Sequence, residues 1–408
     1  MKILLINKYW YPRGGADVYA LWLADELKRR GHSVCIFSVA HPQNIVPSDP
    51  HVFISGVETE KPNILDAPRT IGRMVWSFEA QRELAAFIER ENPDVAHVHN
   101  LYTQMSPSVL PVLSKAKIPV VATVHDYGMT SANYSLFDDQ GVDHIGSWGS
   151  VVRRRGIKRS LVASVIGASV FELHRRLHVY ERNITRMIFT TEFARRLFAA
   201  RGWNGDRGVV IPYVVTLHDE EKKPHQDGGF FLFAGRLHRT KGVHVLIDAA
   251  RATGLPVKIV GDGPDMEWLR HQAGAMMNVE FLGSLPRPRV LELMRTARAV
   301  IVPSVWWEPF GLVALEPQGL GTPVIASNIA GLAEVIVHRQ TGIQVEPNDV
   351  QQLSQAMRYI NDHPEEAMRM GAMGKRRVEA LYSIEEHMRK ILEVYRVLSR
   401  NPSPAKGR

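Results

Sequence analysis

The sequence predicts an α/β protein with two doubly wound domains in tandem, each built on a parallel sheet that is covered by helices on both faces. Two observations lead to this prediction. Short apolar runs alternate with helix-length segments along the whole chain, which is typical of parallel strands buried on both faces. The chain also has 408 residues, too many for one ordinary hydrophobic core.

The first series of alternating segments defines a domain that we expect over residues 1–215. Its first helix is expected over 16–30 and is stopped by Gly31. Strands are expected over 3–7, 34–38, 95–99, 120–124, 187–190 and 209–211. Residues 213–229 then become polar and charged, so we place the domain boundary in this stretch.

The second series defines a domain expected over residues 216–383. Its strands are expected over 230–234, 257–260, 279–282, 300–302, 324–326 and 343–345. An amphipathic helix at about 384–400 is predicted to pack back on the first domain, and 401–408 to form a flexible tail. Ligands of doubly wound sheets bind at the carboxyl ends of strands, so a site between the two domains is expected.

Composition indicates a soluble globular protein, and a cytoplasmic location is expected. Charged residues make up 23% and hydrophobic residues 45% of the chain. The single cysteine, Cys35, cannot form an internal disulfide, which fits a reducing compartment. No apolar stretch reaches the roughly 20 residues that a membrane-spanning helix needs. The apolar start at 1–7 predicts a strand rather than a secretory signal.

Positive charge is concentrated in residues 148–207. This segment holds thirteen Lys or Arg against four Asp or Glu, a charge of +9, whereas the whole chain carries +8. Such a local excess fits a solvated helix face, or an anionic partner such as a membrane surface or a lipid diphosphate. Nucleic acid is not expected as a partner, because the cations are not interleaved with stacking aromatic residues in a recognised pattern.

Residues 308–316, Glu-Pro-Phe-Gly-Leu-Val-Ala-Leu-Glu, are the most informative stretch. They follow the strand expected over 300–302, and a helix is expected to open after Gly311. The unpaired N–H groups and positive dipole end of a helix start suit an anion. The carboxylates of Glu308 and Glu316 can accept hydrogen bonds from hydroxyl groups. The stretch therefore predicts a ligand with phosphate at one end and hydroxyls beside it, such as a nucleotide sugar.

Two cations follow the strand expected over 230–234. Arg236 stands at the strand end, and Lys241 comes five residues later at a helix start. Lysine at a helix N-terminus opposes the helix dipole, which favours a functional role, and two cations there can neutralise a diphosphate. The sequence has no Asp-x-Asp pair that could hold a metal-bound sugar nucleotide. We therefore predict a site that requires neither a metal nor a cofactor.

Two glycine-rich turns follow predicted strands. Gly261 and Gly263 begin a dinucleotide-binding pattern, but Met266 stands where the pattern requires glycine. The turn is therefore weak evidence for a nicotinamide or flavin enzyme. Gly14 and Gly15 make a similar turn into the first helix, where the backbone could approach a substrate.

Histidines end two strands of the first domain. His97 and His99 fall on one face of a strand, a pattern more often explained by hydrogen-bonded structure than by a zinc site. His125, followed by Asp126, is the stronger candidate, because an imidazole at a strand end can hydrogen-bond a sugar hydroxyl or a phosphate oxygen. A serine hydrolase is not supported, since no Gly-x-Ser-x-Gly motif occurs.

The chain resembles the retaining glycosyltransferases of the GT-B fold, family four, over nearly its full length. The motifs that carry the resemblance are Gly14-Gly15, Asp94 to Asn100, Thr123 to Tyr127, Gly235 to Leu237 with Lys241-Gly242, Val260 to Pro264, Glu308 to Glu316 and Gly321 to Ser327. The resemblance implies two Rossmann-like domains, the first for the acceptor and the second for the nucleotide sugar. It also implies transfer of a hexosyl unit from a nucleoside diphosphate sugar to a hydroxyl acceptor, in bacterial polysaccharide or glycolipid assembly.

The same resemblance implies roles for single residues. Glu316 would hold the ribose hydroxyls, Arg236 and Lys241 the diphosphate, and His125 a hydroxyl of the donor sugar. Glu308 and the N–H groups after it would hold the donor sugar itself. The remaining substrate-binding candidates are Gly14, Gly15, Asn100, Asp126, Gly261, Gly263, Phe310, Gly311, Leu312 and Val313.

Two departures and several alternatives accompany the resemblance. Pro317 follows Glu316 where many relatives have alanine, so the helix is expected either to begin late, near Ala314, or to be kinked. The region 127–180 lacks the cysteine cluster of some relatives, so acceptor residues there cannot be carried over. A nucleotide-sugar epimerase of the same fold and a non-catalytic nucleotide-sugar sensor remain open. A lipid-linked acceptor at the inner face of the membrane would account for the basic segment 148–207.

Overall fold

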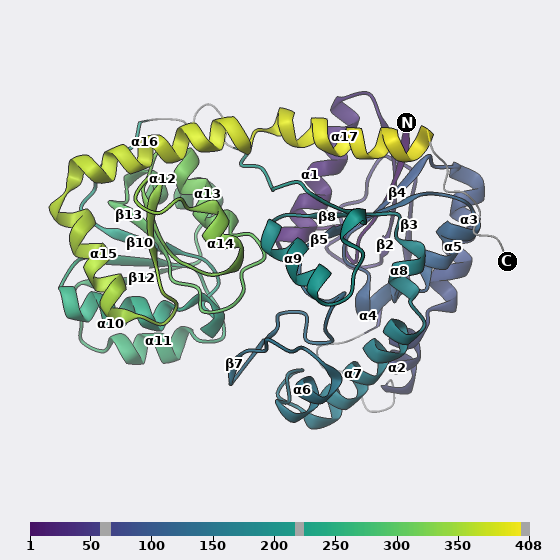
Figure 1. Ribbon diagram of the computed structural model, residues 1–408, viewed down its shortest axis with the longest axis horizontal. Coiled ribbons are helices and arrows are strands. Elements are labelled where there is room, and N and C mark those ends of the chain that lie inside the picture. The colour runs from purple at the N-terminus through teal and green to yellow at the C-terminus, as the bar shows by residue number, and fades with distance from the viewer. Residues whose placement is uncertain (58–66, 217–223, 401–408) are drawn as a thin grey trace. The chain divides into compact units, whose positions relative to one another are not determined.

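The computed structural model describes residues 1–57, 67–216 and 224–400, and these form two compact units (Figure 1). Unit 1 comprises Met1–Thr190, Arg195–Ile211 and the chain from Met388 onward, whereas unit 2 comprises Thr191–Ala194 and Pro212–His387. Each unit is built on a parallel sheet with helices, which confirms the predicted fold class. The tail predicted over 401–408 lies outside the described residues.

Unit 1 contains a seven-stranded parallel sheet in the order β3-β2-β1-β4-β5-β8-β9. The central strand β1 is mostly apolar, and Ile3, Leu4, Leu5 and Ile6 are fully buried, as expected for a strand covered on both faces. The strands are β1 (Lys2–Ile6), β2 (Ser33–Val39), β3 (His51–Ile54), β4 (Val95–Val98), β5 (Val120–Val124), β8 (Arg186–Phe189) and β9 (Gly208–Val210), with a separate hairpin of β6 (Phe137–Asp138) and β7 (Gly141–Val142).

Helices connect the strands of unit 1. The first, α1, buries Ala20, Leu23 and Leu27 along one face, the spacing of a helix that packs on a sheet. The helices are α1 (Gly15–Arg29), α2 (Ala67–Val75), α3 (Phe78–Glu91), α4 (Tyr102–Met105), α5 (Val109–Lys115), α6 (Trp148–Arg153), α7 (Leu161–Arg176), α8 (Val179–Asn183) and α9 (Glu192–Ala200), with a 3₁₀ turn η2 (Gly205–Arg207). The end of α17 (Ile384–Arg400) completes the unit.

Unit 2 contains a six-stranded parallel sheet in the order β12-β11-β10-β13-β14-β15. Its strands are β10 (Phe231–Ala234), β11 (Val257–Val260), β12 (Val279–Gly283), β13 (Ala299–Val302), β14 (Val324–Ser327) and β15 (Gly342–Val345). Its helices are η4 (Arg239–Lys241), α10 (Val243–Thr253), α11 (Met266–Ala273), α12 (Arg287–Thr296), α13 (Leu312–Gly319), α14 (Ala330–Val335), α15 (Val350–Asp362) and α16 (Pro364–Leu381).

The strand order of unit 2 is what brings its candidate residues together. Strands β10 and β13 are neighbours in the sheet although residues 235–298 lie between them in the chain, with β11 and β12 to one side. Because both strands run in the same direction, the loops that follow them leave the same edge of the sheet.

Three details differ from the sequence-based expectations. Strand β3 was not predicted, since His-Val-Phe-Ile is short, only half-buried and next to polar loops. The hairpin of β6 and β7 was also missed, because each strand has two residues. A late start of the helix near Ala314 is wrong: α13 begins at Leu312 and contains Pro317. The helix ends two residues after that proline, at Gly319, so little helix follows the missing N–H group.

Candidate active site

In unit 2, Glu308 lies in the loop that follows β13, and its carboxylate accepts hydrogen bonds from three side chains. Lys241 Nζ donates to both carboxylate oxygens, at 2.8 Å and 2.9 Å. Trp306 Nε1 and Ser304 Oγ donate to Oε2 at 2.7 Å and 3.2 Å. The residue is only 8% exposed, so the carboxylate depends on these partners. Three of these four contacts fall on Oε2, and among the described residues Lys241 is the one donor to Oε1. Because each carboxylate oxygen has about two lone-pair sites, a sugar hydroxyl can still bind at Oε1.

The two cations predicted to hold a diphosphate have different surroundings. Lys241 follows β10 in the turn η4, is paired with Glu308 and lies with Nζ 5.4 Å from the centre of the Trp306 ring. Arg236 is exposed in the loop directly after β10, and no hydrogen bond or ion pair from the described residues engages its guanidinium group. The structure thus leaves Arg236 available to an anion, whereas Lys241 already has a carboxylate partner, with which an anion must compete or share the ammonium group.

Glu316 is also paired in the absence of a ligand. It lies in the second turn of α13, and Arg287, the first residue of α12, donates from Nη1 to its Oε1. Arg287 Nη2 reaches the carbonyl of Thr216 at 3.3 Å. The Glu316 side chain is 19% exposed and that of Arg287 is 51% exposed. One oxygen of Glu316 is therefore held by a surface cation, whereas no donor from the described residues contacts Oε2.

The candidate glycines of unit 2 are explained by the local structure of the chain. Gly261 has a φ of 132°, and a Cβ there would lie 1.8 Å from the carbonyl oxygen of Gly235. A Cβ on Gly263 would lie 2.2 Å from the carbonyl oxygen of Leu237. Gly311, the N-cap of α13, has a φ of 102°, and a Cβ there would meet a side-chain carbon 2.4 Å away. Gly261 and Gly263 need glycine because the backbone of a neighbouring segment passes closely, and Gly311 needs it because of its positive φ, whatever ligand they bind.

Three further candidates surround the start of α13. Phe310 is buried, with its ring 5.2 Å from that of Tyr213, so its side chain supports the loop by packing. Leu312 and Val313 are the first two residues of the helix. Gly311 has no side chain with which to cap their N–H groups. The loop is thus fixed by packing while its backbone donors remain without a side-chain cap.

In unit 1, three histidines lie together at the ends of β4 and β5. His99 Nδ1 lies 2.9 Å from His125 Nε2, and the rings of His97 and His99 stack with centres 4.4 Å apart. His97 Nδ1 contacts the hydroxyl of Tyr395 at 2.6 Å, and its Nε2 contacts Thr123 Oγ1 at 2.7 Å. This arrangement agrees with the expectation that His97 and His99 are hydrogen-bonded structure.

Burial keeps the imidazoles of His99 and His125 uncharged. It lowers the pKa of His125 from 6.5 to about 3. It also lowers the pKa of His99 well below its ordinary value, and the neighbouring His97 and His125 add to the effect. The ring of Tyr19 meets both imidazoles edge-on, at 5.7 Å from His99 and 5.6 Å from His125. A neutral His125 can exchange hydrogen bonds with a hydroxyl but carries no charge for a phosphate.

Asp126 and Asn100 flank the histidines. Asp126 accepts from the Tyr102 hydroxyl at 2.6 Å and from the backbone N–H of Gly128 at 2.8 Å. Burial raises the pKa of Asp126, and these two hydrogen bonds oppose the rise. The N–H of Asn100 donates to Asn7 Oδ1 at 3.3 Å, which ties the ends of β1 and β4 together. The Asp126 side chain therefore already has structural partners, whereas Asn100 is held through its backbone and its buried Oδ1 has no hydrogen-bond partner among the described residues.

Gly14 and Gly15 lie at the start of α1 in unit 1. Gly14 is the N-cap residue, with an extended backbone, and a Cβ there would come no closer than 3.8 Å to another residue. A Cβ on Gly15 would meet nothing within 4 Å. Unlike Gly261, these glycines are not required by the packing of the chain, so their predicted approach to a ligand remains a prediction.

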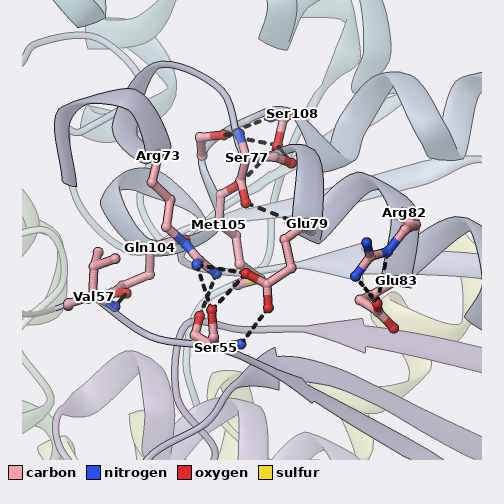
Figure 2. A network of polar contacts seen from close by, with 12 residues as sticks. Ser55, Val57, Arg73, Ser77, Glu79, Arg82, Glu83, Gln104, Met105 and Ser108 are labelled. Carbon is pink, nitrogen blue, oxygen red and sulfur yellow. Dashed lines mark hydrogen bonds and ion pairs between the residues drawn. The ribbon is translucent and has the colours of Figure 1, made fainter. Parts of the chain in front are cut away.

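A buried polar network supports the loop after β4 (Figure 2). Arg73 on α2 donates from Nε to the carbonyl of Gln104 at 2.7 Å and from Nη1 to Ser55 Oγ at 2.9 Å and Glu79 Oε2 at 3.0 Å. The Gln104 side chain pairs with the backbone N–H and carbonyl of Val57 at 3.0 Å and 2.6 Å. One arginine thus connects α2, α3, the end of β3 and the loop that carries α4.

Sequence reasoning missed several of these partners. Ser304 and Trp306 lie within four residues of Glu308, so their position in the same loop was a usable signal. Arg287, Tyr19 and Tyr395 come from other elements and reach the candidate residues only through the fold. Within the described residues, no group of three or more His, Cys, Asp or Glu is arranged to hold a metal ion.

Two family models match the chain. A model described as "Glycosyl transferase 4-like domain" matches residues 14–214, and one described as "Glycosyl transferases group 1" matches residues 216–377. The chain belongs to the group 1 glycosyltransferases. The two matches meet nearly end to end, and the GT-B fold and retaining family four indicated by the motifs are thereby confirmed.

Known proteins are similar to this glycosyltransferase in sequence and in structure. A glycogen synthase of Mycobacterium tuberculosis is 26% identical over 413 residues, covering 93% of this chain and 90% of that protein. The D-rhamnosyltransferase WbpZ of Pseudomonas aeruginosa is 38% identical over 158 residues, covering 38% of this chain and 42% of its own. A sucrose-phosphate synthase structure from Thermosynechococcus elongatus superimposes with a TM-score of 0.73 at 21% identity, covering 97% of this chain and 98% of its own.

None of the helices in the described parts of this glycosyltransferase combines the length and apolar character needed to cross a membrane. The region 127–180, where the acceptor residues could not be carried over from relatives, holds the small hairpin and helices α6 and α7 of unit 1.

Proposed function

We propose that the protein is a retaining hexosyltransferase that moves a hexosyl unit from a nucleoside diphosphate sugar to a hydroxyl group of its acceptor. The observation that carries this proposal is the grouping of Arg236, Lys241 and Glu308 after the neighbouring strands β10 and β13, with Glu316 in the helix that follows. Cations for a diphosphate and carboxylates for hydroxyls thus leave one edge of one sheet.

The names of relatives support the same ligand class. The structure of HepE from Anabaena was solved with UDP-glucose. A curated relative of 26% identity is named phosphatidyl-myo-inositol mannosyltransferase. We accordingly assign the sugar nucleotide to the domain 216–383 and the acceptor to the domain 1–215, within bacterial polysaccharide or glycolipid assembly. Glucose and mannose in these names are hexoses, which supports a hexosyl donor.

The chemistry we propose is attack by the acceptor hydroxyl on the same face of the sugar that the diphosphate leaves. The departing diphosphate takes the hydroxyl proton, so no protein base is required. Arg236 and Lys241 stabilise the negative charge that grows on the leaving group, and this electrostatic effect is the main contribution of the protein. Glu316 holds the ribose, while Glu308 and the start of α13 hold the sugar.

A panel of nucleotide sugars tests the proposal. A ligand that binds only the folded state raises its melting temperature, so the correct donor is the one that gives the largest shift. That donor is then incubated with hydroxyl acceptors, and the anomeric configuration of the product is read by NMR. Inversion of the anomeric centre would contradict a retaining mechanism, and no melting shift with any nucleotide sugar would contradict the ligand class.

Two other functions fit the same fold. An epimerase acts on the donor alone, so a labelled nucleotide sugar incubated without acceptor would yield its epimer. A sensor would bind the donor without consuming it. The exposed Arg236, in the same loop region as the Lys241–Glu308 pair, suits binding of the diphosphate in all three functions, so the product formed from the labelled donor separates them.

We also propose that the enzyme works in the cytoplasm at an anionic membrane, on a lipid-linked acceptor. The basic segment 148–207 suggested this location, but some of its cations are bound within the chain and are not available to a membrane. Arg154 is held by Asp138, Arg186 by the carbonyl of Asp206, and Arg207 by the carbonyl of Glu181. These cations serve the fold, so the electrostatic argument depends on those that remain exposed.

Helices α6 and α7 lie side by side (Figure 1), and these helices and the segment between them carry exposed cations and exposed large apolar residues. We call this the α6–α7 surface and define it by Trp148, Arg153, Arg155, Leu161, Val162 and Val165. Val162 is 68% exposed, and Trp148 is 45% exposed and donates from Nε1 to Ser169 on α7 at 3.1 Å. Large apolar side chains next to cations suit the interface of an anionic bilayer.

Vesicle flotation tests the α6–α7 surface. Binding to vesicles with anionic lipid should exceed binding to neutral phosphatidylcholine vesicles and should weaken with salt. Each cation near such a surface contributes about 1 kcal/mol, so R153E/R155E should weaken binding by at least about 30-fold. V162S removes an exposed apolar side chain of the α6–α7 surface and should also weaken binding. Its matched control is M277S, which removes an apolar side chain that is 99% exposed on unit 2. Equal recovery on both vesicle types would contradict the proposal.

A further inference from the structure

Two of the three imidazoles at the ends of β4 and β5, His99 and His125, are hydrogen-bonded to each other, and His99 has a ring nitrogen without a partner. His99 uses Nδ1 for its contact with His125 Nε2, at 2.9 Å. His99 is fully buried, and within the described residues its other ring nitrogen, Nε2, has no hydrogen-bond partner. The neighbouring His97 differs, because both of its nitrogens are bonded, to Tyr395 and to Thr123.

The position of one proton decides what His99 and His125 can do. A neutral imidazole carries a single N–H, and only one of the two nitrogens in the contact can donate. If His125 donated, the proton of His99 would sit on Nε2 as a buried N–H without an acceptor. If His99 donates from Nδ1, the unsatisfied atom is a lone pair. Buried N–H groups without acceptors are rarer in proteins than unsatisfied acceptors, so the second arrangement is favoured.

We propose that His99 is a positioning residue that donates from Nδ1 to His125 and thereby holds the proton of His125 on Nδ1. The second half of the statement follows from the first, because a neutral His125 whose Nε2 accepts a hydrogen bond must carry its hydrogen on Nδ1. Burial lowers the pKa of both residues, which keeps each imidazole neutral at physiological pH and leaves one proton per ring to place.

The consequence for catalysis rests on the proposed contact between His125 and a sugar hydroxyl. In that contact the N–H of His125 would be the donor to the sugar oxygen, while the lone pair on its Nε2 accepts from His99. His125 is therefore excluded as the base that takes the proton of the acceptor. This agrees with the proposed transfer of that proton to the leaving diphosphate.

The tautomer is measured directly by NMR, with no substrate present. Protein labelled with ¹⁵N in its histidine rings should show, for His125, a protonated Nδ1 and an unprotonated, hydrogen-bond-accepting Nε2. The resonances are assigned by their loss in H125Q. A His125 ring protonated on Nε2 in the wild-type protein would overturn the proposal, and the result does not depend on whether the enzyme transfers sugar.

Variants at position 99 then test the cause. In H99F the ring shape is retained but the donor is lost, so the His125 resonances should shift toward a mixture of tautomers. In H99N the amide nitrogen occupies roughly the place of Nδ1 and should restore the wild-type pattern. H174F is the matched control, since it removes another buried imidazole of unit 1, bonded to the Val75 carbonyl at 2.7 Å, without touching this pair. Unchanged His125 resonances in H99F would overturn the role of His99.

Kinetics complete the test once a donor is known. Loss of one oriented hydrogen bond to a sugar oxygen should lower kcat in H99F by about tenfold, with the donor KM changed less, and H99N should recover most of that loss. Normal NMR behaviour with no transfer in any variant would contradict the proposed function but not the tautomer. The tautomer shift with wild-type kcat in H99F would contradict the catalytic consequence alone.

Discussion

Lys241 and Glu308 are bound to each other in the unliganded protein: Nζ of the lysine lies 2.8 Å and 2.9 Å from the two carboxylate oxygens. Both residues were expected to contact the donor, one through the diphosphate and the other through the sugar. Their pairing means that each is already neutralised before the donor arrives. A diphosphate that binds Lys241 therefore competes with Glu308, or joins it around the same ammonium group.

The pair separates a structural from a catalytic effect. K241M leaves Glu308 buried without its cation, which should destabilise the fold by about 3 kcal/mol. The double variant K241M/E308Q removes both charges, and the glutamine side chain that replaces Glu308 can still accept from Trp306, so stability should largely return. Transfer activity should stay at least about a hundredfold below wild type in both proteins. Urea unfolding and transfer rates are compared, and near-normal activity in the stable double variant would rule out a direct role for Lys241.

Glu316 should decide whether the enzyme distinguishes ribose from deoxyribose. If its Oε2 accepts from a ribose hydroxyl, wild-type kcat/KM should fall by about tenfold when the donor carries a 2′-deoxyribose. E316A should have low kcat/KM on both donors and little preference between them. R287A removes only the surface cation on Oε1 and should keep the preference. An unchanged preference in E316A would place the ribose elsewhere.

Local patterns were sufficient to predict the strands that matter for the site. Buried parallel strands such as β1, β5 and β13 are nearly continuous apolar runs, and their ends could be located to within about one or two residues. Strand β3 escaped because its pairing with β2, rather than its own composition, makes it a strand. Glu308 could likewise be predicted as a site residue from its local sequence, whereas its hydrogen bond with Lys241 depends on the pairing of strands and could not be predicted.

Contacts between distant segments were beyond the sequence. Arg287 pairs with Glu316 across 29 residues, and Tyr395 reaches His97 across 298. Nothing in the composition of either segment marks its partner, since the fold alone brings them together. The glycine motifs show a related limit: Gly261 was interpreted as a ligand turn, but the close approach to Gly235 explains it without any ligand.

Acid should destabilise the protein through its buried histidines. The pKa of His125 is lowered from 6.5 to about 3, so between these values the unfolded state binds a proton that the folded state does not. The free energy of unfolding should therefore fall with pH below about 6.5, by about 1.4 kcal/mol per unit for each such histidine. Burial lowers the pKa of His99 in the same direction, so the two losses add.

Urea unfolding over a series of pH values measures this slope. H125F should show a shallower loss of stability between neutral and mildly acidic pH, because one titrating group is gone. H271Q, which changes an exposed histidine on unit 2, should follow the wild-type slope. Equal slopes for wild type and H125F would mean that His125 becomes protonated in the folded state at ordinary pH.

Two glycines offer a matched pair of substitutions with opposite expectations. G261A forces a Cβ to within 1.8 Å of a backbone oxygen at a φ of 132°, so it should destabilise unit 2 by at least about 3 kcal/mol. G15A adds a Cβ that meets nothing within 4 Å at the start of α1 and should leave stability unchanged or slightly higher. If the backbone at Gly15 approaches the bound diphosphate or acceptor, the stable G15A protein should nevertheless lose kcat/KM by about tenfold or more. Full activity in a stable G15A protein would show that no ligand comes close to this turn.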